Sequence, residues 1–121
     1  MVRRRREEVT DIERGDILLV DFAPAQAGEA DNTRPAVVIT NDVANEHSPA
    51  IVVIPLTSNT ARIYPFELFL PASRTGLDYD SKAQAQFIRH VSKARIRRNL
   101  SHLPADLMGE LDERVRGHLG L

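Results

Sequence analysis

Residues 27–58 decide the fold, and they read AGEADNTRPAVVITNDVANEHSPAIVVIPLTS. Two apolar runs lie in this stretch, AVVIT at residues 36–40 and AIVVIPL at residues 50–56. Apolar runs of this length that are rich in Val and Ile, and bounded by Asn, Asp and Pro, are typical of strands buried on both faces. We therefore predict two rigid strands that pair with each other and follow a polar loop at residues 27–33.

Three polar side chains flank these two runs. Glu29 lies in the preceding loop, Arg34 stands just before the first run, and Thr57 follows the second run. Polar groups at the ends of stiff strands suit chemistry that needs a fixed geometry. The chain has no cysteine, which excludes disulfides, thiolate catalysis and Cys-ligated zinc. A carboxylate, a guanidinium and a hydroxyl are therefore the candidate catalytic groups.

Length and composition indicate a single domain. With 121 residues, of which 42% are apolar, the chain can bury a substantial core and is too short to divide. No apolar run approaches the roughly 18 residues that span a bilayer, and no apolar stretch of signal-peptide type follows the charged N-terminus. We expect a cytoplasmic protein that does not associate with membranes.

The charges are unevenly distributed along the chain. The formal net charge is −1, but residues 1–60 carry six basic and ten acidic side chains, whereas residues 61–121 carry ten basic and seven acidic ones. A near-neutral total argues against nonspecific coating of nucleic acid, which needs many phosphate contacts at once. It allows a local groove that binds a few nucleotides. The four histidines show no ligand spacing, so we expect no metal site.

The charged N-terminal segment and the first glycine of the chain indicate where the globular domain begins. Residues 1–12 are charged and lack hydrophobic periodicity, which predicts a disordered basic tail, with a nucleic-acid-binding arm as the alternative. Order is expected to begin near Gly15, which allows a turn into the first strand. The globular domain is therefore expected to comprise residues 13–121.

The remaining elements complete a small β fold. Further strands are predicted at residues 17–22, 66–70 and 81–91, and the apolar residues 66, 68 and 70 should face the core. The basic segment at 92–99 is expected to form one or two helical turns. A final helix begins near Pro104, and its apolar stripe comprises Leu107, Leu111, Val115 and Leu119. Five or six short strands closed by one helix predict a mainly β fold, an antiparallel barrel with a C-terminal α-helix.

Several short blocks form one ordered pattern. In chain order they are GDI at 15–17, VDFAP at 20–24, Glu29, RPAVV at 34–38, PLTS at 55–58, YPFE at 64–67 and IR at 88–89. In this order and spacing they resemble the MazF/PemK (Kid) toxins of type II toxin–antitoxin systems, from about residue 13 to the C-terminus. The resemblance implies an SH3-like (CcdB/MazF-like) barrel, a homodimer and neutralisation by a cognate antitoxin. It also implies a metal-independent, sequence-specific endoribonuclease (mRNA interferase) that cleaves single-stranded RNA.

The three candidate catalytic groups suit RNA cleavage. RNA supplies its own nucleophile, because the 2′-hydroxyl can attack the adjacent phosphorus, so no metal or other cofactor is required. Glu29 is the candidate general base, a role that contributes about 10²- to 10⁴-fold. Arg34 can grip two phosphate oxygens, and Thr57 can hydrogen-bond a non-bridging oxygen or the attacking hydroxyl. In the family the matching arginine is often assigned as the general acid; we favour charge stabilisation as its main role, because arginine is effectively always protonated.

Two departures from the family pattern concern RNA recognition. The family usually has Gly-Ser-Glu-Gln ahead of Arg-Pro, whereas residues 27–32 read AGEADN, so base recognition at this loop must differ. Phe87 occupies the position of a family glutamine, and Gln86 precedes it. Phe87 either stacks on an unpaired base or fills the core. The candidate RNA-binding residues are Asn32, Ser58, Ser81, Gln86, Phe87 and Arg89.

Other interpretations fit the same residues. Glu29 and Arg34 could form only a loop ion pair, which contributes at most about 1 kcal/mol at a surface. Alternatively, the chain is a CcdB-like, non-enzymatic toxin that binds and poisons DNA gyrase through its C-terminal helix. In either toxin class an antitoxin is the expected partner; for a nuclease it would present a helix or an extended peptide, rich in acidic and apolar residues, that competes with RNA.

Overall fold

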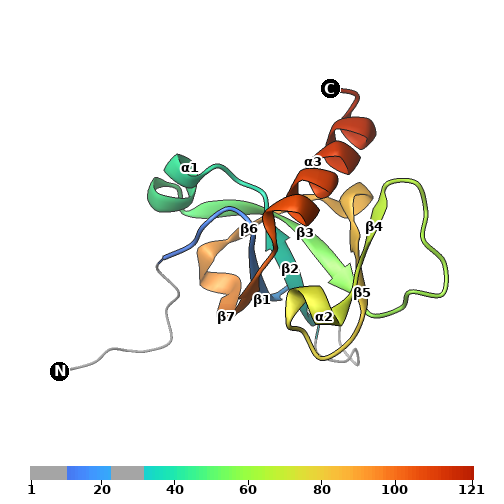
Figure 1. Cartoon of the computed structure of the whole chain (residues 1–121). Helices are drawn as coiled ribbons and strands as arrows, with labels where there is room; N and C mark the ends of the chain where they lie inside the picture. The colour runs from blue at the N-terminus through green and yellow to red at the C-terminus, as the bar shows by residue number, and fades with distance from the viewer. Residues whose placement is uncertain (1–10, 23–31) are drawn as a thin grey trace.

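Seven strands and one long C-terminal helix make up the part of the chain that the structure describes (Figure 1). The computed structural model describes residues 11–22 and 32–121. The strands are β1 (Asp16–Asp21), β2 (Thr33–Val38), β3 (Ala50–Thr57), β4 (Glu67–Leu70), β5 (Ser81–Gln84), β6 (Arg89–Ser92) and β7 (Ile96–His102). The helices are α1 (Asp42–His47), α2 (Ala72–Thr75) and α3 (Ala105–Leu119), with 3₁₀ turns η1 (Ala85–Phe87) and η2 (Lys93–Arg95). The mainly β fold with a C-terminal helix is confirmed.

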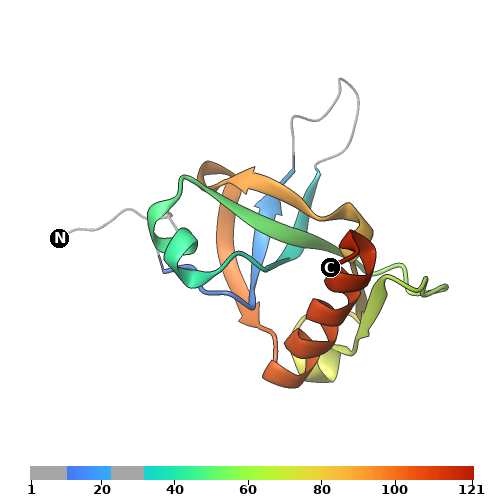
Figure 2. The same ribbon diagram turned by 90° about the horizontal axis from the view of Figure 1, so that it is seen from above.

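Strand β3 is the centre of the sheet, and all its pairings are antiparallel. Its first half pairs with β6, its middle with β2, and its last two residues, Leu56 and Thr57, with β5. The strand order is β4-β5-β3-β2-β1-β7, with β6 also paired to β3. Seen from above, the strands curl around a common interior (Figure 2). The antiparallel barrel predicted from the sequence is thus confirmed in an open form, since no pairing between described strands joins β4 to β7.

Both faces of the central strands are buried. One core cluster contains Val37 and Ile54 and packs against α3, whereas a second cluster contains Val38 and Val53. Successive residues of a strand face opposite sides, so each Val/Ile run supplies both clusters. This confirms the double-sided burial predicted for β2 and β3. Ile12 belongs to the second cluster, so packing begins one residue before the predicted boundary.

Helix α3 lies over one end of the sheet and packs with the predicted stripe. Leu107 and Leu111 are buried, with Met108 beside them, but Leu119 is 49% exposed, so the buried stripe stops before the helix ends. Gly120 closes the helix in the left-handed conformation that favours glycine. The described ranges hold no helix with the length and apolar character that a membrane span requires.

The prediction of one long strand at residues 81–91 is wrong. Strand β5 ends at Gln84, η1 makes a tight turn closed by the Ile88 N–H donating to the Ala85 carbonyl, and β6 begins at Arg89. The turn allows the chain to pass from the end of β3, which pairs with β5, to the start of β3, which pairs with β6. Leu56 pairs with Ala83 and Val53 pairs with Arg89, so three steps along β3 correspond to six steps along the partner segment, and η1 takes up the extra residues.

Two other sequence predictions are corrected by the pairing partners. Residues 92–99 are not helical beyond η2, because residues 96–102 form β7 and pair with β1. Leu68 and Leu70 of β4 are buried as predicted, but Phe66, just before the strand, is 40% exposed, whereas Glu67 is buried. The short helix α2 was not predicted from the sequence; its C-cap is Gly76, with φ +79°.

Candidate active site

Arg34 and Thr57 lie at the same end of the β2–β3 pair. Ala36 lies opposite Pro55, so Arg34, two residues before Ala36, and Thr57, two residues after Pro55, come to the same end of the ladder. Arg34 lies within β2 rather than ahead of it. Its side chain is exposed and makes no hydrogen bond or ion pair with any residue that the structure describes. The Thr57 hydroxyl accepts a 3.2 Å hydrogen bond from the Asn59 N–H.

Arg34 and Thr57 together form a wall shared by two pockets. The first, of about 730 Å³, we call the Arg98 pocket; it is also lined by Ser58, Asp78, Tyr79, Ser81, Arg98 and Asn99. The second, of about 640 Å³, we call the Phe87 pocket; it is also lined by Asn32, Lys82, Gln84, Gln86, Phe87 and Arg89. A ligand bound at Arg34 can therefore extend into either pocket.

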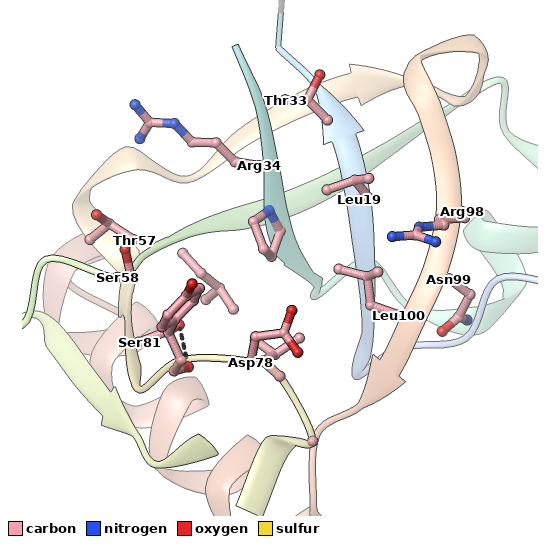
Figure 3. Close-up of a pocket in the computed structure, with 15 residues that line it drawn as sticks. Leu19, Thr33, Arg34, Thr57, Ser58, Asp78, Ser81, Arg98, Asn99 and Leu100 are labelled. Atoms are coloured by element: carbon pink, nitrogen blue, oxygen red, sulfur yellow. Dashed lines mark hydrogen bonds between the residues drawn. The ribbon is translucent and has the colours of Figure 1, made fainter. Parts of the chain in front are cut away.

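The Arg98 pocket lies between β7 and the end of β3 (Figure 3). Arg98 and Asn99 come from β7 on one side, and Ser58 comes from the other side, beside Thr57. Asp78, from the segment between α2 and β5, lies between them. The pocket therefore combines two guanidinium groups, one carboxylate and several hydroxyls or amides.

All of the predicted RNA-binding residues line one pocket or the other. Ser58 and Ser81 line the Arg98 pocket, and the other four line the Phe87 pocket. Ser81 is buried, and its hydroxyl donates a 3.2 Å hydrogen bond to the Tyr79 carbonyl. Of the three predicted catalytic residues, Arg34 and Thr57 come together, whereas Glu29 lies outside the described residues.

Phe87 forms an exposed apolar surface at the rim of its pocket. Its side chain is 56% exposed, so it does not fill the core. The turn η1 points it outwards and leaves Ala85 buried. The guanidinium of Arg89 lies 5.2 Å from the centre of the Phe22 ring in a cation–π contact, which holds Arg89 beside the same pocket.

A buried ion pair supports the polar side of the Phe87 pocket. The Nζ atom of Lys82 lies 2.8 Å from Oε1 of Glu67, and their side chains are only 8% and 1% exposed. The side-chain amides of Gln84 and Gln86 both donate to Oε2 of Glu67, at 3.2 and 2.6 Å. Lys82 also donates a 2.6 Å hydrogen bond to the Arg62 carbonyl. The carboxylate thus fixes the orientation of three pocket-lining side chains.

The environment of Glu67 keeps its carboxylate ionised. Burial alone would raise the pKa of Glu67, but the hydrogen bonds from Lys82, from the Tyr64 N–H and from Gln86 and Gln84 outweigh burial and lower the pKa to about 2. The carboxylate therefore stays charged and acceptor-only at neutral pH. Because its oxygens are already hydrogen-bonded by the protein, Glu67 is placed to position neighbours rather than to exchange protons.

Four residues that line the two pockets were not predicted as site residues from the sequence: Lys82, Gln84, Asp78 and Arg98. Lys82 and Gln84 alternate with small buried residues on β5, a period-2 pattern that could have placed them on one face. Arg98 was assigned to a helical turn, which hid its position on a strand. Asp78 lies between elements and carries no sequence signal of its pocket.

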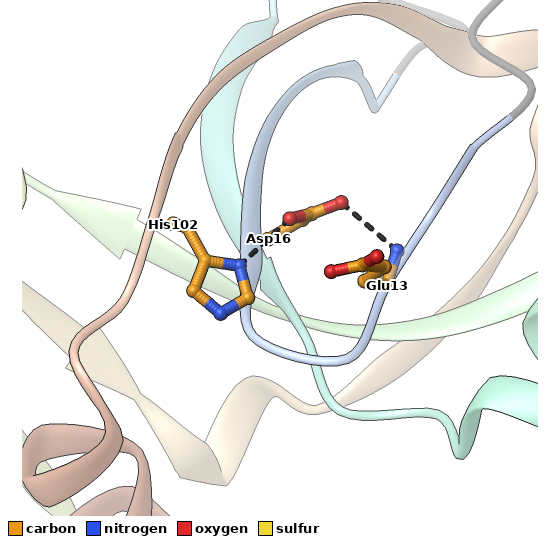
Figure 4. Close-up of side chains that lie close together, drawn as sticks. All are labelled: Glu13, Asp16 and His102. Carbon is orange, nitrogen blue, oxygen red and sulfur yellow. Dashed lines mark hydrogen bonds and ion pairs between the residues drawn. The ribbon is translucent and has the colours of Figure 1, made fainter.

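A second polar cluster ties the start of β1 to the end of β7 (Figure 4). Ligand atoms of Glu13, Asp16 and His102 lie within 4.8 Å of one another. Both Asp16 oxygens are already used: Oδ1 lies 2.8 Å from His102 Nδ1, and Oδ2 accepts from the Glu13 N–H at 2.9 Å. The His102 ring lies over Gly15, where an added Cβ would come within 3.1 Å of it. We interpret this cluster as a structural support of the turn.

Comparison with known proteins gives one matching family. The sequence model of the family described as "PemK-like, MazF-like toxin of type II toxin-antitoxin system" matches residues 13–119. The curated protein "Endoribonuclease MazF9" of Mycobacterium tuberculosis is 44% identical over 113 residues, which cover 89% of this chain and 96% of that protein.

Solved structures agree with the fold. A MazE–MazF crystal structure from Deinococcus radiodurans matches with a TM-score of 0.79 and 28% identity, over 92% of this chain and 97% of the other. A MazF crystal structure from the same organism matches with a TM-score of 0.76 and 27% identity, over 91% of this chain and 97% of the other.

Proposed function

This chain belongs to the PemK-like, MazF-like family of toxins of type II toxin–antitoxin systems and is an endoribonuclease of that class, and we propose that it cleaves single-stranded RNA at short sequences without a metal ion. The observation that carries the proposal is the wall shared by the two pockets. A guanidinium that has no partner among the described residues and a hydroxyl lie there together, with a pocket on each side. A phosphodiester bound on this wall leaves room for one nucleotide in each pocket.

The proposed reaction is an internal transfer of the phosphate. The 2′-oxygen bonds to the adjacent phosphorus, the 2′-hydroxyl proton passes to a base, and the bond to the 5′-oxygen breaks. The 5′-oxygen takes up a proton from water and leaves as a 5′-hydroxyl, while the upstream fragment keeps a 2′,3′-cyclic phosphate. Glu29 is our candidate for the base, which accepts the proton in the first step.

Arg34 has the properties of a charge stabiliser. Negative charge on the non-bridging oxygens increases as the phosphorane forms, and a guanidinium can donate two parallel hydrogen bonds to these oxygens. Arg34 has no partner among the described residues that would have to be displaced. Thr57 would donate its hydroxyl hydrogen to one of the same oxygens, while its oxygen keeps the Asn59 N–H bond.

The product ends test this proposal. Cleavage of RNA by the purified, antitoxin-free protein is expected to proceed at an unchanged rate in excess EDTA and to leave a 5′-hydroxyl and a 2′,3′-cyclic phosphate. Sequencing of the cut ends would give the cleavage motif in the same experiment. Cleavage only after addition of Mg²⁺, or products with a 5′-phosphate, would contradict the proposed chemistry.

Phe87 is proposed to stack on a base next to the cleavage site. Replacement by Ala should weaken binding of a single-stranded RNA by about 1–3 kcal/mol, because aromatic stacking contributes about this much per base. Thermal stability should stay close to that of the wild type, since Phe87 is exposed. Phe69→Ala is the matched control: Phe69 is 40% exposed on β4 and does not line the Phe87 pocket. Equal loss of RNA binding in both variants would contradict base stacking at Phe87.

The proposed partners follow from the family. We propose that the chain acts in the cytoplasm as a homodimer and is neutralised by its cognate antitoxin. The matching MazE–MazF structure supports an antitoxin partner. An acidic, extended antitoxin segment across Arg34 would block both pockets, so antitoxin and RNA should compete for the protein.

A further inference from the structure

Arg98 presents an unpartnered guanidinium to the pocket that bears its name. It lies on β7 opposite Leu19 of β1, and its side chain is exposed. Figure 3 shows the Arg98 guanidinium on the side of β7 that faces Leu19. It makes no hydrogen bond or ion pair with any other residue in the described ranges.

The neighbouring arginine on the same strand is placed differently. Arg97 lies 2.5 Å from the Asp21 carboxylate and does not line the Arg98 pocket. Leu19 pairs with Arg98 and Val20 pairs with Ile96, so Arg97 is the extra residue at an irregularity of the ladder, where its charge is held by Asp21. Position on the strand, and not the basic composition of the segment, brings Arg98 to the pocket.

The charge balance of the Arg98 pocket favours an anion. Arg34 and Arg98 contribute two positive charges, and Asp78 is the one acidic residue among the residues that line it. Arg98 and Arg34 lie on opposite sides of the pocket, on β7 and β2 (Figure 3). An RNA backbone that has one phosphate on Arg34 and continues across this pocket runs towards Arg98.

We propose that Arg98 positions the RNA by binding the phosphodiester next to the one that is cleaved, on the opposite side of the Arg34–Thr57 wall from the base stacked on Phe87. This inference rests on the proposed ribonuclease function. Arg98 would not touch the reacting phosphate, so it acts on binding and positioning and leaves the chemical step to the residues on the wall. The RNA then needs nucleotides on both sides of the cut, and each side depends on a different pocket.

Salt dependence and kinetics test the role of Arg98. Arg98→Ala should raise KM about 10-fold, as expected for a lost charge-assisted phosphate contact, and leave kcat within about twofold. The magnitude of the slope of log affinity against log salt concentration should fall by the contribution of about one phosphate contact. Affinity is measured with an oligonucleotide whose cut site is blocked by a 2′-deoxy nucleotide. Arg97→Ala removes the same charge from the adjacent position and should change neither quantity appreciably.

Shortened substrates give a second, independent readout. Starting from a mapped cut site, nucleotides are removed from one side of the cut or from the other. One truncation should abolish the difference between wild type and Arg98→Ala, and the other should abolish the difference between wild type and Phe87→Ala. The proposal is overturned if one truncation removes both differences, or if Arg98→Ala and Arg97→Ala behave alike.

Different results would contradict the proposed ribonuclease function and the proposed role of Arg98. If the wild-type protein does not cleave RNA, or does so only with a divalent metal, the proposed function itself is wrong. If the wild type cleaves as proposed but Arg98→Ala retains the wild-type KM and salt slope, only the role of Arg98 is wrong. Arg98→Lys separates charge from geometry, because it should restore the salt slope and only part of the affinity.

Discussion

Arg34→Ala is expected to lower kcat for RNA cleavage by about 10²- to 10³-fold, the usual cost of removing one donor that stabilises transition-state charge. The thermal stability of the variant should be close to that of the wild type. Arg34 is exposed and makes no hydrogen bond or ion pair with a described residue, so its removal takes away no structural contact of this kind. Single-turnover cleavage of an oligonucleotide with a mapped cut site would measure the effect.

Two comparisons show whether Arg34 acts on the transition state. Arg34→Lys keeps a positive charge but loses the bidentate fork, so its rate should lie between those of the Ala variant and the wild type. A change confined to KM would mean that Arg34 binds ground state and transition state equally. Toxicity that survives Arg34→Ala unaltered would contradict a catalytic role for Arg34.

Lys82→Met is expected to cost about 3–5 kcal/mol of unfolding free energy, because it leaves a buried carboxylate without its cation. The Glu67 side chain is 1% exposed and depends on Lys82 for its counter-charge. Urea unfolding followed by circular dichroism measures the loss. The double variant Glu67→Gln with Lys82→Met should recover part of it, since no buried charge remains. Arg74→Met, which breaks an ion pair of exposed side chains, is the control and should hardly move the unfolding midpoint.

Acid unfolding gives a second measure of the same ion pair. The folded-state pKa of Glu67 is about 2, below the ordinary value of 4.5. Because the folded-state pKa is lowered, the ionised carboxylate stabilises the fold at pH values above the ordinary pKa. This contribution to the free energy of unfolding, about 3 kcal/mol, is lost as the pH falls from about 4.5 towards about 2. Glu67→Gln should lack this part of the pH dependence. A Gln variant with the same acid-unfolding slope as the wild type would contradict the assignment.

The strands that the sequence predicts well are those whose burial is local and continuous. The Val- and Ile-rich runs of β2 and β3 are buried on both faces, so every residue carries the signal. Helix α3 shows its apolar stripe directly. Arg34 and Thr57 could be predicted as candidate catalytic residues because they lie at the ends of the two Val- and Ile-rich strands.

The errors arise where a partner distant in sequence decides the conformation. Residues 85–87 turn because β5 and β6 pair with β3 in two registers that differ by three residues, which no local pattern encodes. Strand β7 exposes most of its side chains and carries little alternation, so its basic residues resembled a helical segment. Glu67 is buried on β4 because Lys82 on β5 neutralises it. Arg98 was missed for the same reason as β7 itself.

The most direct test of the site is a crystal structure with an RNA oligonucleotide whose cut site carries a 2′-deoxy nucleotide. We expect the scissile phosphate on the Arg34–Thr57 wall, within hydrogen-bond distance of the Arg34 guanidinium and the Thr57 hydroxyl, with the flanking nucleotides in the two pockets. We also expect the Glu29 carboxylate next to the 2′-position. A scissile phosphate bound away from Arg34 and Thr57, or both flanking nucleotides in one pocket, would contradict it.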